Sequence, residues 1–322
     1  MTTAQIMQLA AACAPAGKPA TLVETHISWV LLTDEWAFKI KKPVQFSFLD
    51  FSTLERRHFF CHRELELNAR LTSGVYLQVQ PVVQRGEAIL IGQEGTVIDY
   101  AIQMKRLDNT RQMHLLLEQG AVTPTHITQL AKQIATFHAH AHRASPKLNI
   151  EAMQHNFADI LKINAFLQQT VGAAAVAAVT QAVQASADFL TQHEHRIMQR
   201  QRQGFVVDGH GDLHAGNIFL LKQPVIFDCI EFNDALRQLD MLDEIAFLCL
   251  DLHQQPGLEQ LFLQQYLQQM PCMETEEDEH IYRYYKQYRA NIRLKVACLR
   301  AIQQSGAIDM RDIQNYLQLL QM

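Results

Sequence analysis

Apolar runs separated by short polar turns dominate the chain up to residue 107. Each run has the length of a β-strand, and polar residues fill the intervening turns at 33–35 and 84–87. The pattern predicts a hairpin near the N-terminus, followed by further strands. We expect strands at residues 21–32, 36–40, 75–83, 88–91 and 97–107.

Beyond residue 107 the pattern changes to the three- and four-residue spacing of amphipathic helices. Within the first part, the sequence Ser52-Thr53-Leu54-Glu55 is typical of a capping box that opens a helix reaching about residue 71. We therefore predict an α/β fold with a boundary between residues 1–107 and 108–322. Further helices are expected at 123–143, 150–169, 173–200, 258–270, 274–303 and 309–320.

The candidate catalytic and metal-binding side chains are concentrated in residues 206–232. A short apolar strand leads to His210 and Asp212, and Asn217 follows Asp212 by five residues. Two more apolar runs end at Asp228. A phosphoryl-transfer site needs one carboxylate to orient the attacking hydroxyl, and an amide oxygen with a second carboxylate to hold magnesium. The order predicts Asp212 in the first role, with Asn217 and Asp228 as metal ligands.

Two other interpretations of this segment compete. His210, Asp212 and His214 could form a metal-hydrolase site, but such sites commonly read His-x-His-x-Asp-His, and Asp208 and Leu213 stand where two ligands would fall. Alternatively, the acidic and amide residues are only turn formers. That interpretation explains each residue singly but not the three-part pattern.

Composition narrows the class of protein. The 322 residues are 48% hydrophobic and carry a net charge of −5 without any basic block, so a nucleic-acid partner is not expected. The six cysteines include no Cys-x-x-Cys pair, which is typical of reduced thiols in a cytoplasmic protein. The longest apolar run, residues 171–179, is too short to span a bilayer, so no membrane partner is expected.

The stretch His-Gly-Asp-Leu-His-x-Gly-Asn at residues 210–217, with Phe227-Asp228-Cys229 after it, resembles the aminoglycoside phosphotransferase and choline kinase branch of the protein-kinase-like superfamily. Ala215 stands where that branch often has proline, and Cys229 replaces a glycine. The resemblance implies a two-lobe fold. Residues 1–107 would form a small antiparallel-sheet N-lobe, and 108–322 a larger helical C-lobe with the catalytic loop, metal site and acceptor pocket.

The resemblance also implies roles for individual residues. Lys39, within Ala-Phe-Lys at 37–39, would grip the nucleotide phosphates and be held by Glu64 on the apolar stripe of the first long helix. Lys41 points to the same face of the strand, and we prefer Lys39. His210 and Asn217 would act beside Asp212 in the catalytic loop, and Asp240 would brace that loop. Nucleotide contacts are expected from Ser28, although no glycine-rich loop is present, and from backbone groups of Met104 and Arg106 in the hinge.

The implied function is an ATP- and Mg²⁺-dependent phosphotransferase of bacterial type, with a hydroxyl of a small molecule as acceptor. Alternatives are a nucleotide-binding regulatory module with little turnover and, third, a protein kinase, for which the run from Asp228 to Asp240 leaves little room for an activation segment. The wording ETHISWVLL and AFKIKKPV is similar to a bacterial branch often fused to a P-loop ATPase domain. That domain's Gly-x-x-x-x-Gly-Lys-Ser/Thr motif is absent, so it would be a separate partner.

Overall fold

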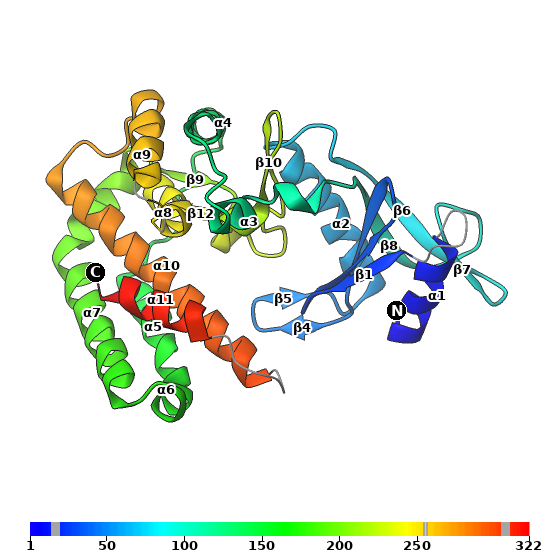
Figure 1. Ribbon diagram of the computed structural model, residues 1–322, viewed down its shortest axis with the longest axis horizontal. Coiled ribbons are helices and arrows are strands. Elements are labelled where there is room, and N and C mark those ends of the chain that lie inside the picture. Colours follow the sequence, from blue (N-terminus) through cyan, green and yellow to red (C-terminus); the bar gives the residue numbers. More distant parts are fainter. Residues whose placement is uncertain (14–19, 254, 256, 304–309, 322) are drawn as a thin grey trace. The chain divides into compact units, whose positions relative to one another are not determined.

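The computed structural model describes residues 1–13, 20–253, 255, 257–303 and 310–321, and the chain divides into two compact units (Figure 1). Unit 1 contains Met1–Val122 and Ala215–Arg237, and unit 2 contains Thr123–His214 and Gln238–Met322. This division differs from the expected boundary after residue 107. Residues 108–122 and 215–237 belong to the sheet-bearing unit because they pack with each other and with its strands.

Unit 1 is built on a six-stranded antiparallel sheet in the order β1-β2-β3-β8-β6-β7. Helix α1 (Thr3–Ala12) packs on β1 and β7, and helix α2 (Leu54–Ala69) packs on β6 and β8. Buried apolar residues of α1 and the sheet, such as Leu9, Leu31 and Ile40, form one core. The strands are β1 Thr21–Glu24, β2 Ser28–Leu32, β3 Trp36–Lys41, β6 Tyr76–Arg85, β7 Ala88–Ile91 and β8 Thr96–Lys105.

The single strand predicted at residues 21–32 is two strands joined by a tight turn. The side-chain oxygen of Thr25 accepts the N–H of Ser28 at 2.9 Å, while the N–H of Thr25 donates to the Ser28 carbonyl at 2.9 Å. Threonine can close a turn in this way without glycine or proline. The turn reverses the chain, so that β1 and β2 pair with Leu22 opposite Leu31.

The start of α2 also differs from the prediction. Thr53 is the N-cap, because its side chain accepts the N–H of Arg56 at 3.3 Å. Ser52 bonds to Asp50 instead, with 2.6 Å between its hydroxyl and the carboxylate, so the capping box that begins at Ser52 is wrong although the helix is present. Residues 43–50 contain the short hairpin β4 (Gln45–Phe46) and β5 (Leu49–Asp50).

The remainder of unit 1 fastens the segment after Ala215 to the rest of the unit. The hairpin β10 (Ile218–Leu220) and β11 (Pro224–Ile226) carries a bridge from Gln112 to Phe219. The guanidinium of Arg111 donates twice to the Leu220 carbonyl, at 2.9 and 2.7 Å. The other elements are the 3-10 helices η2 (Asn109–Arg111), η4 (Ala215–Asn217) and η5 (Asp234–Leu236), and the helix α3 (Met113–Glu118).

Unit 2 is helical apart from the strand pair β9 (Val206–Asp208) and β12 (Gln238–Asp240). Helix α8 is buried along nearly its whole length and packs on α9 and α10. The helix predicted at 150–169 is divided by the 3-10 turn η3 (Asp159–Ile163). The helices are α4 Pro124–His140, α5 Ile150–Ala158, α6 Asn164–Thr170, α7 Ala173–Arg202, α8 Met241–Leu252, α9 Leu258–Gln269, α10 Glu276–Gln303 and α11 Met310–Leu320.

Helix α7 combines an apolar first half with buried arginines. By length and composition it is the one helix among the described residues that could cross a membrane, a test that core helices of folded proteins also pass. Near its C-terminal end, Arg200 bonds to Asp240 and to Asp278, each at 2.7 Å, and Arg196 bonds to Asp278 at 2.7 Å. These buried ion pairs tie the C-terminal end of α7 to β12 and to the start of α10 within unit 2.

Candidate active site

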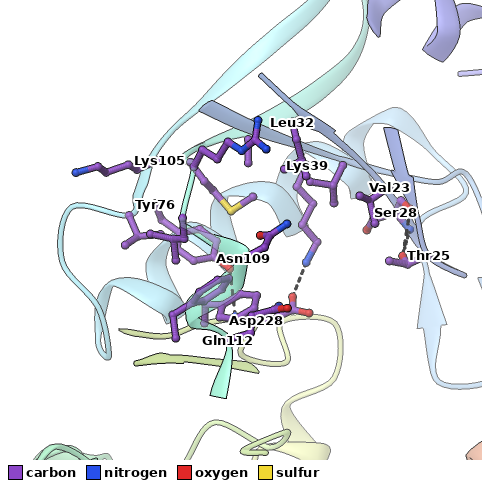
Figure 2. Close-up of a pocket in the computed structure, with 18 of the residues that line it drawn as sticks. Val23, Thr25, Ser28, Leu32, Lys39, Tyr76, Lys105, Asn109, Gln112 and Asp228 are labelled. Atoms are coloured by element: carbon purple, nitrogen blue, oxygen red, sulfur yellow. Dashed lines mark hydrogen bonds and ion pairs between the residues drawn. The ribbon is translucent and has the colours of Figure 1, made fainter. Parts of the chain in front are cut away.

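A cavity of about 650 Å³ lies within unit 1 and has the size of a small-molecule site (Figure 2). Its walls come from the β1–β2 turn, the faces of β2 and β3, the end of β8 and the hairpin β10–β11. Most of the lining is apolar, while Lys39 and Asp228 bring charge to one end. Figure 2 shows the Lys39 side chain reaching toward Asp228.

Lys39 stands at the centre of an ion-pair network. Its ammonium lies 2.7 Å from Oε1 of Glu64 and 2.5 Å from Oδ1 of Asp228. Burial lowers the pKa of Lys39, but the two carboxylates outweigh it and hold that pKa well above the ordinary value. The structure thus brings Lys39 and Glu64 together, with the lysine facing the cavity.

Lys41 contacts the same glutamate from behind the cavity wall. Its ammonium lies 2.6 Å from Oε2 of Glu64 and also contacts Glu231. Burial would raise the pKa of Glu64, but the two ammonium groups lower it to about 2, so this carboxylate is ionised. The sequence had placed both lysines on one face of β3. It had not identified Glu231, because that residue lies in an irregular segment after Asp228.

Asp228 holds an uncommon backbone conformation. Its φ of 64° is the one positive value at a non-glycine residue in the described part of the chain. A left-handed conformation costs roughly 1–2 kcal/mol, and such residues cluster at functional sites. The Asp228 N–H donates to the Tyr76 hydroxyl at 3.2 Å, and the Cys229 N–H donates to the Asn68 side chain at 3.0 Å. These contacts hold a carboxylate that is 43% exposed and lines the cavity.

Asn217 lies beside the strand that leads to Asp228. Its carbonyl accepts the N–H of Phe227 at 3.1 Å, directly before Asp228, and its side chain is buried. The β10–β11 hairpin lies between Asn217 and Asp228 in the sequence, and Ile218 pairs with Ile226 in it. An amide oxygen and a carboxylate are the hard oxygen donors that Mg²⁺ prefers, so these residues fit that ion.

The metal-hydrolase interpretation finds no support. Within the described ranges, no three His, Cys, Asp or Glu side chains gather as a potential metal site. His210, Asp212 and His214 therefore do not form the ligand set that such an enzyme would need.

The two expected hinge residues line the cavity at the end of β8. Met104 pairs with Ala37 in the sheet, and the N–H of Arg106 donates to the Glu35 carbonyl at 2.8 Å. Leu107 is the next lining residue, and in the described structure its N–H has no acceptor. Ser28 also lines the cavity, and its buried hydroxyl oxygen has no hydrogen-bond partner among the described residues.

The loop predicted as catalytic belongs to unit 2. His210 is buried, and its Nδ1 accepts the N–H of Asp212 at 3.2 Å, so the ring shapes the loop. The Asp212 carboxylate is 40% exposed and lies 3.5 Å from Nε2 of His214. Burial would raise the pKa of Asp212, but His214, His210 and Arg289 lower it below its usual range. Asp212 is therefore a carboxylate at neutral pH.

Glu244 on α8 supports this loop. Its Oε1 accepts the N–H groups of both His210 and Gly211 at 2.7 Å. Its Oε2 lies 2.7 Å from Nε2 of His138 on α4, whose Nδ1 lies 2.6 Å from the Tyr266 hydroxyl on α9. Three helices thus converge on the backbone of the loop through a chain of buried polar contacts. Nothing in the sequence singled out His138 for this role.

The prediction that Asp240 braces the loop is wrong. Asp240 is the N-cap of α8, where its carboxylate accepts the N–H of Leu242 at 2.8 Å and pairs with Arg200. Glu244, one turn later, occupies the loop side. A Cβ at Gly209 would lie 2.4 Å from Oε2 of Glu244, so this position needs glycine for the carboxylate to approach the backbone.

Known proteins resemble the chain in sequence. A model of the phosphotransferase enzyme family matches residues 61–277. Uncharacterized proteins of Mycobacterium bovis and Mycobacterium tuberculosis are 31% identical over 284 residues, which are 86% of this chain and 54% of theirs. The chain therefore spans about half the length of the curated relatives it matches.

Solved structures share the fold. A choline kinase from Cryptosporidium parvum has a TM-score of 0.57 at 9% identity, covering 99% of this chain and 95% of its own. The GDP complex of a wild-type aminoglycoside 2'-phosphotransferase has a TM-score of 0.56 at 15% identity, covering 99% and 97%. The predicted protein-kinase-like α/β fold is confirmed. Because the family model covers more than half of the sequence, the chain belongs to the phosphotransferase enzyme family.

Proposed function

We propose that the protein transfers a phosphoryl group from ATP to a hydroxyl group of a small molecule, in the presence of Mg²⁺. One observation carries the proposal. At one end of a cavity of ligand size, the Lys39 ammonium joins a buried glutamate of α2 to the exposed carboxylate of Asp228. This arrangement offers a cation to phosphates and an oxygen ligand to a metal ion.

The nucleotide would occupy the cavity of unit 1. The apolar walls suit a purine ring, the Leu107 N–H offers it a donor, and the Ser28 hydroxyl and Lys39 are available to phosphates. The structurally similar aminoglycoside 2'-phosphotransferase was solved as a GDP complex, which supports a nucleotide site of this general kind. In our proposal, ATP is the phosphoryl donor.

The protein would promote transfer by positioning the reacting groups and by neutralising the charge of the phosphates. Asn217 and Asp228 would hold Mg²⁺, which when bound neutralises phosphate charge. Lys39, fixed by Glu64, would orient the phosphates. Asp212 would accept the proton of the acceptor hydroxyl, and Glu244 would keep its loop in place.

A nucleotide-binding regulatory module is the second candidate function. The β1–β2 turn, which contributes Thr25, His26, Ile27 and Ser28 to the cavity, contains no glycine. Backbone N–H groups of glycine-rich turns cradle phosphates in many nucleotide enzymes, and a bulkier turn restricts that approach. The separate P-loop ATPase partner implied by the sequence stays a prediction.

Replacing Asp228 with alanine tests the proposed function. The variant should lose the Mg²⁺-dependent part of the thermal stabilisation that ATP gives to the wild type, because it lacks the cavity-lining carboxylate that would bind the ion. Melting temperatures with ATP, with and without MgCl₂, provide the measurement. Asp34→Ala, at an exposed aspartate in the β2–β3 turn, is the control. An Asp228→Ala protein with a full Mg²⁺-dependent shift would contradict the metal assignment.

A further inference from the structure

A second buried ammonium group lies behind the cavity. Lys41 is fully buried, and its ammonium contacts both Glu64, at 2.6 Å, and Glu231. The ring of Phe51 lies 4.7 Å from the same ammonium, so an apolar side chain also encloses it. Buried charges persist only where partners compensate them. Lys41 does not line the described cavity, and its function is therefore not direct contact with a nucleotide.

The two lysines use different oxygens of Glu64. Lys39 contacts Oε1 at 2.7 Å and Lys41 contacts Oε2 at 2.6 Å. Lys39 also contacts Asp228, and a phosphate group in the cavity would compete for the same ammonium. Lys41 pairs independently with the second oxygen, so Glu64 has two counter-charges. Glu64 is fully buried, so the loss of every counter-charge would be unfavourable.

Glu231 links Lys41 to the segment that carries Asp228. This segment begins in the left-handed conformation at Asp228. The carbonyl of Ile230 accepts an N–H of the Arg237 guanidinium at 2.7 Å. Glu231 follows Ile230 and is 5% exposed. Its ion pair with Lys41 fastens the end of the segment to strand β3, while the Asp228 carboxylate at the other end faces the cavity.

We propose that Lys41 and Glu231 are a positioning pair for the metal-binding aspartate: they hold the Asp228 segment against β3. The proposal rests on the proposed function, since it presumes that Asp228 binds Mg²⁺. The pair acts through the backbone of residues 228–231 and makes no contact with the reacting groups. Its removal should therefore alter the response to Mg²⁺ and spare the recognition of the nucleotide itself.

The decisive variant is the double replacement Lys41→Met/Glu231→Gln. Lys41→Met alone leaves Glu231 buried without its ammonium partner, and a folding defect could result. The double variant removes both charges while keeping similar side-chain shapes, so that no carboxylate remains at position 231, and Glu64 keeps Lys39 as its counter-charge. Lys222→Met, at an exposed lysine between β10 and β11, makes the same chemical change away from the network and serves as the control.

Binding of the ATP analogue AMP-PNP is measured by calorimetry, once with MgCl₂ and once with EDTA. In the double variant, the factor by which Mg²⁺ improves affinity should fall by about tenfold or more, the size of effect seen when groups behind a metal ligand are removed. Affinity in EDTA should remain near the wild-type value. The Lys222→Met protein should match the wild type in both conditions.

Each other result has a definite meaning. A folded double variant with the wild-type response to Mg²⁺ overturns the positioning pair while leaving the proposed function intact. An equal loss of affinity in MgCl₂ and EDTA also overturns it, because the pair would then only support the cavity as a whole. A wild-type protein whose nucleotide binding does not respond to Mg²⁺ overturns the inference together with the metal part of the proposed function.

Discussion

Replacing Asp212 with asparagine should lower the rate of phosphoryl transfer by about 10²–10⁴-fold and leave nucleotide affinity nearly unchanged. His214, His210 and Arg289 keep the pKa of Asp212 below its usual range, so the wild type presents a carboxylate at neutral pH. Asparagine keeps the shape but cannot accept a proton. The cavity that we propose for the nucleotide lies within unit 1 and is lined by other residues, so binding should survive.

Two measurements on the same preparations test this expectation. Calorimetry gives the affinity for ATP with Mg²⁺, and a coupled assay gives phosphate transfer to a panel of hydroxyl compounds, or slow ATP hydrolysis. Asp188→Asn, at an exposed aspartate on α7, controls for the loss of one charge in unit 2. If the wild type binds ATP and its turnover stays at background with or without the Asp212 carboxylate, the regulatory module becomes the better account.

Replacing Glu244 with alanine should destabilise unit 2 by about 3–5 kcal/mol and lower turnover strongly. The change leaves two buried N–H groups of the loop and the His138 ring without their acceptor. Glu244→Gln should recover most of the stability, because its amide oxygen can accept the same two N–H groups. Urea unfolding of the three proteins gives the free energies of unfolding. Equal stability of the alanine variant and the wild type would show that the loop does not depend on this side chain.

The difference in free energy of unfolding between the wild type and Glu244→Gln should also depend on pH. Burial raises the pKa of Glu244, but bonds from His138 and the loop dominate and hold it at about 2. A depressed folded pKa contributes stability above the unfolded value of about 4.3, and this contribution is lost as pH falls toward the folded value. The stability difference between wild type and glutamine variant should be constant from about pH 5 to 8 and shrink below about pH 4. A difference that grows on acidification would contradict this assignment.

Residues on regular elements were the most predictable part of the site. Lys39 lies on a strand whose side chains alternate, and Glu64 lies on the apolar stripe of a helix. A charge on a buried stripe requires a partner, and the family resemblance named Lys39 as that partner. The two side chains are observed 2.7 Å apart.

Residues whose role depends on irregular backbone were not predictable. Asp240 and Glu244 are both acidic and one turn apart, and the helix that begins at Met241 decides which of them caps and which faces the loop. Glu231 meets Lys41 across 190 positions of sequence, through a segment without regular structure. Thr25 closes a turn by side-chain hydrogen bonds, and the sequence alone does not distinguish such a threonine from one within a strand.

The interrupted course of the chain through its two units has a consequence for biosynthesis. Unit 1 takes its last strands from Ala215–Arg237, and unit 2 takes its last four helices, α8 to α11, from the chain after Gln238. After Val122, the ribosome must therefore translate the whole of Thr123–His214 before it reaches the rest of unit 1, a delay of roughly 10 s at common elongation rates. During that interval, the sheet exposes the surface that β10 and β11 later cover. Neither unit can therefore be produced intact from one uninterrupted stretch of the coding sequence.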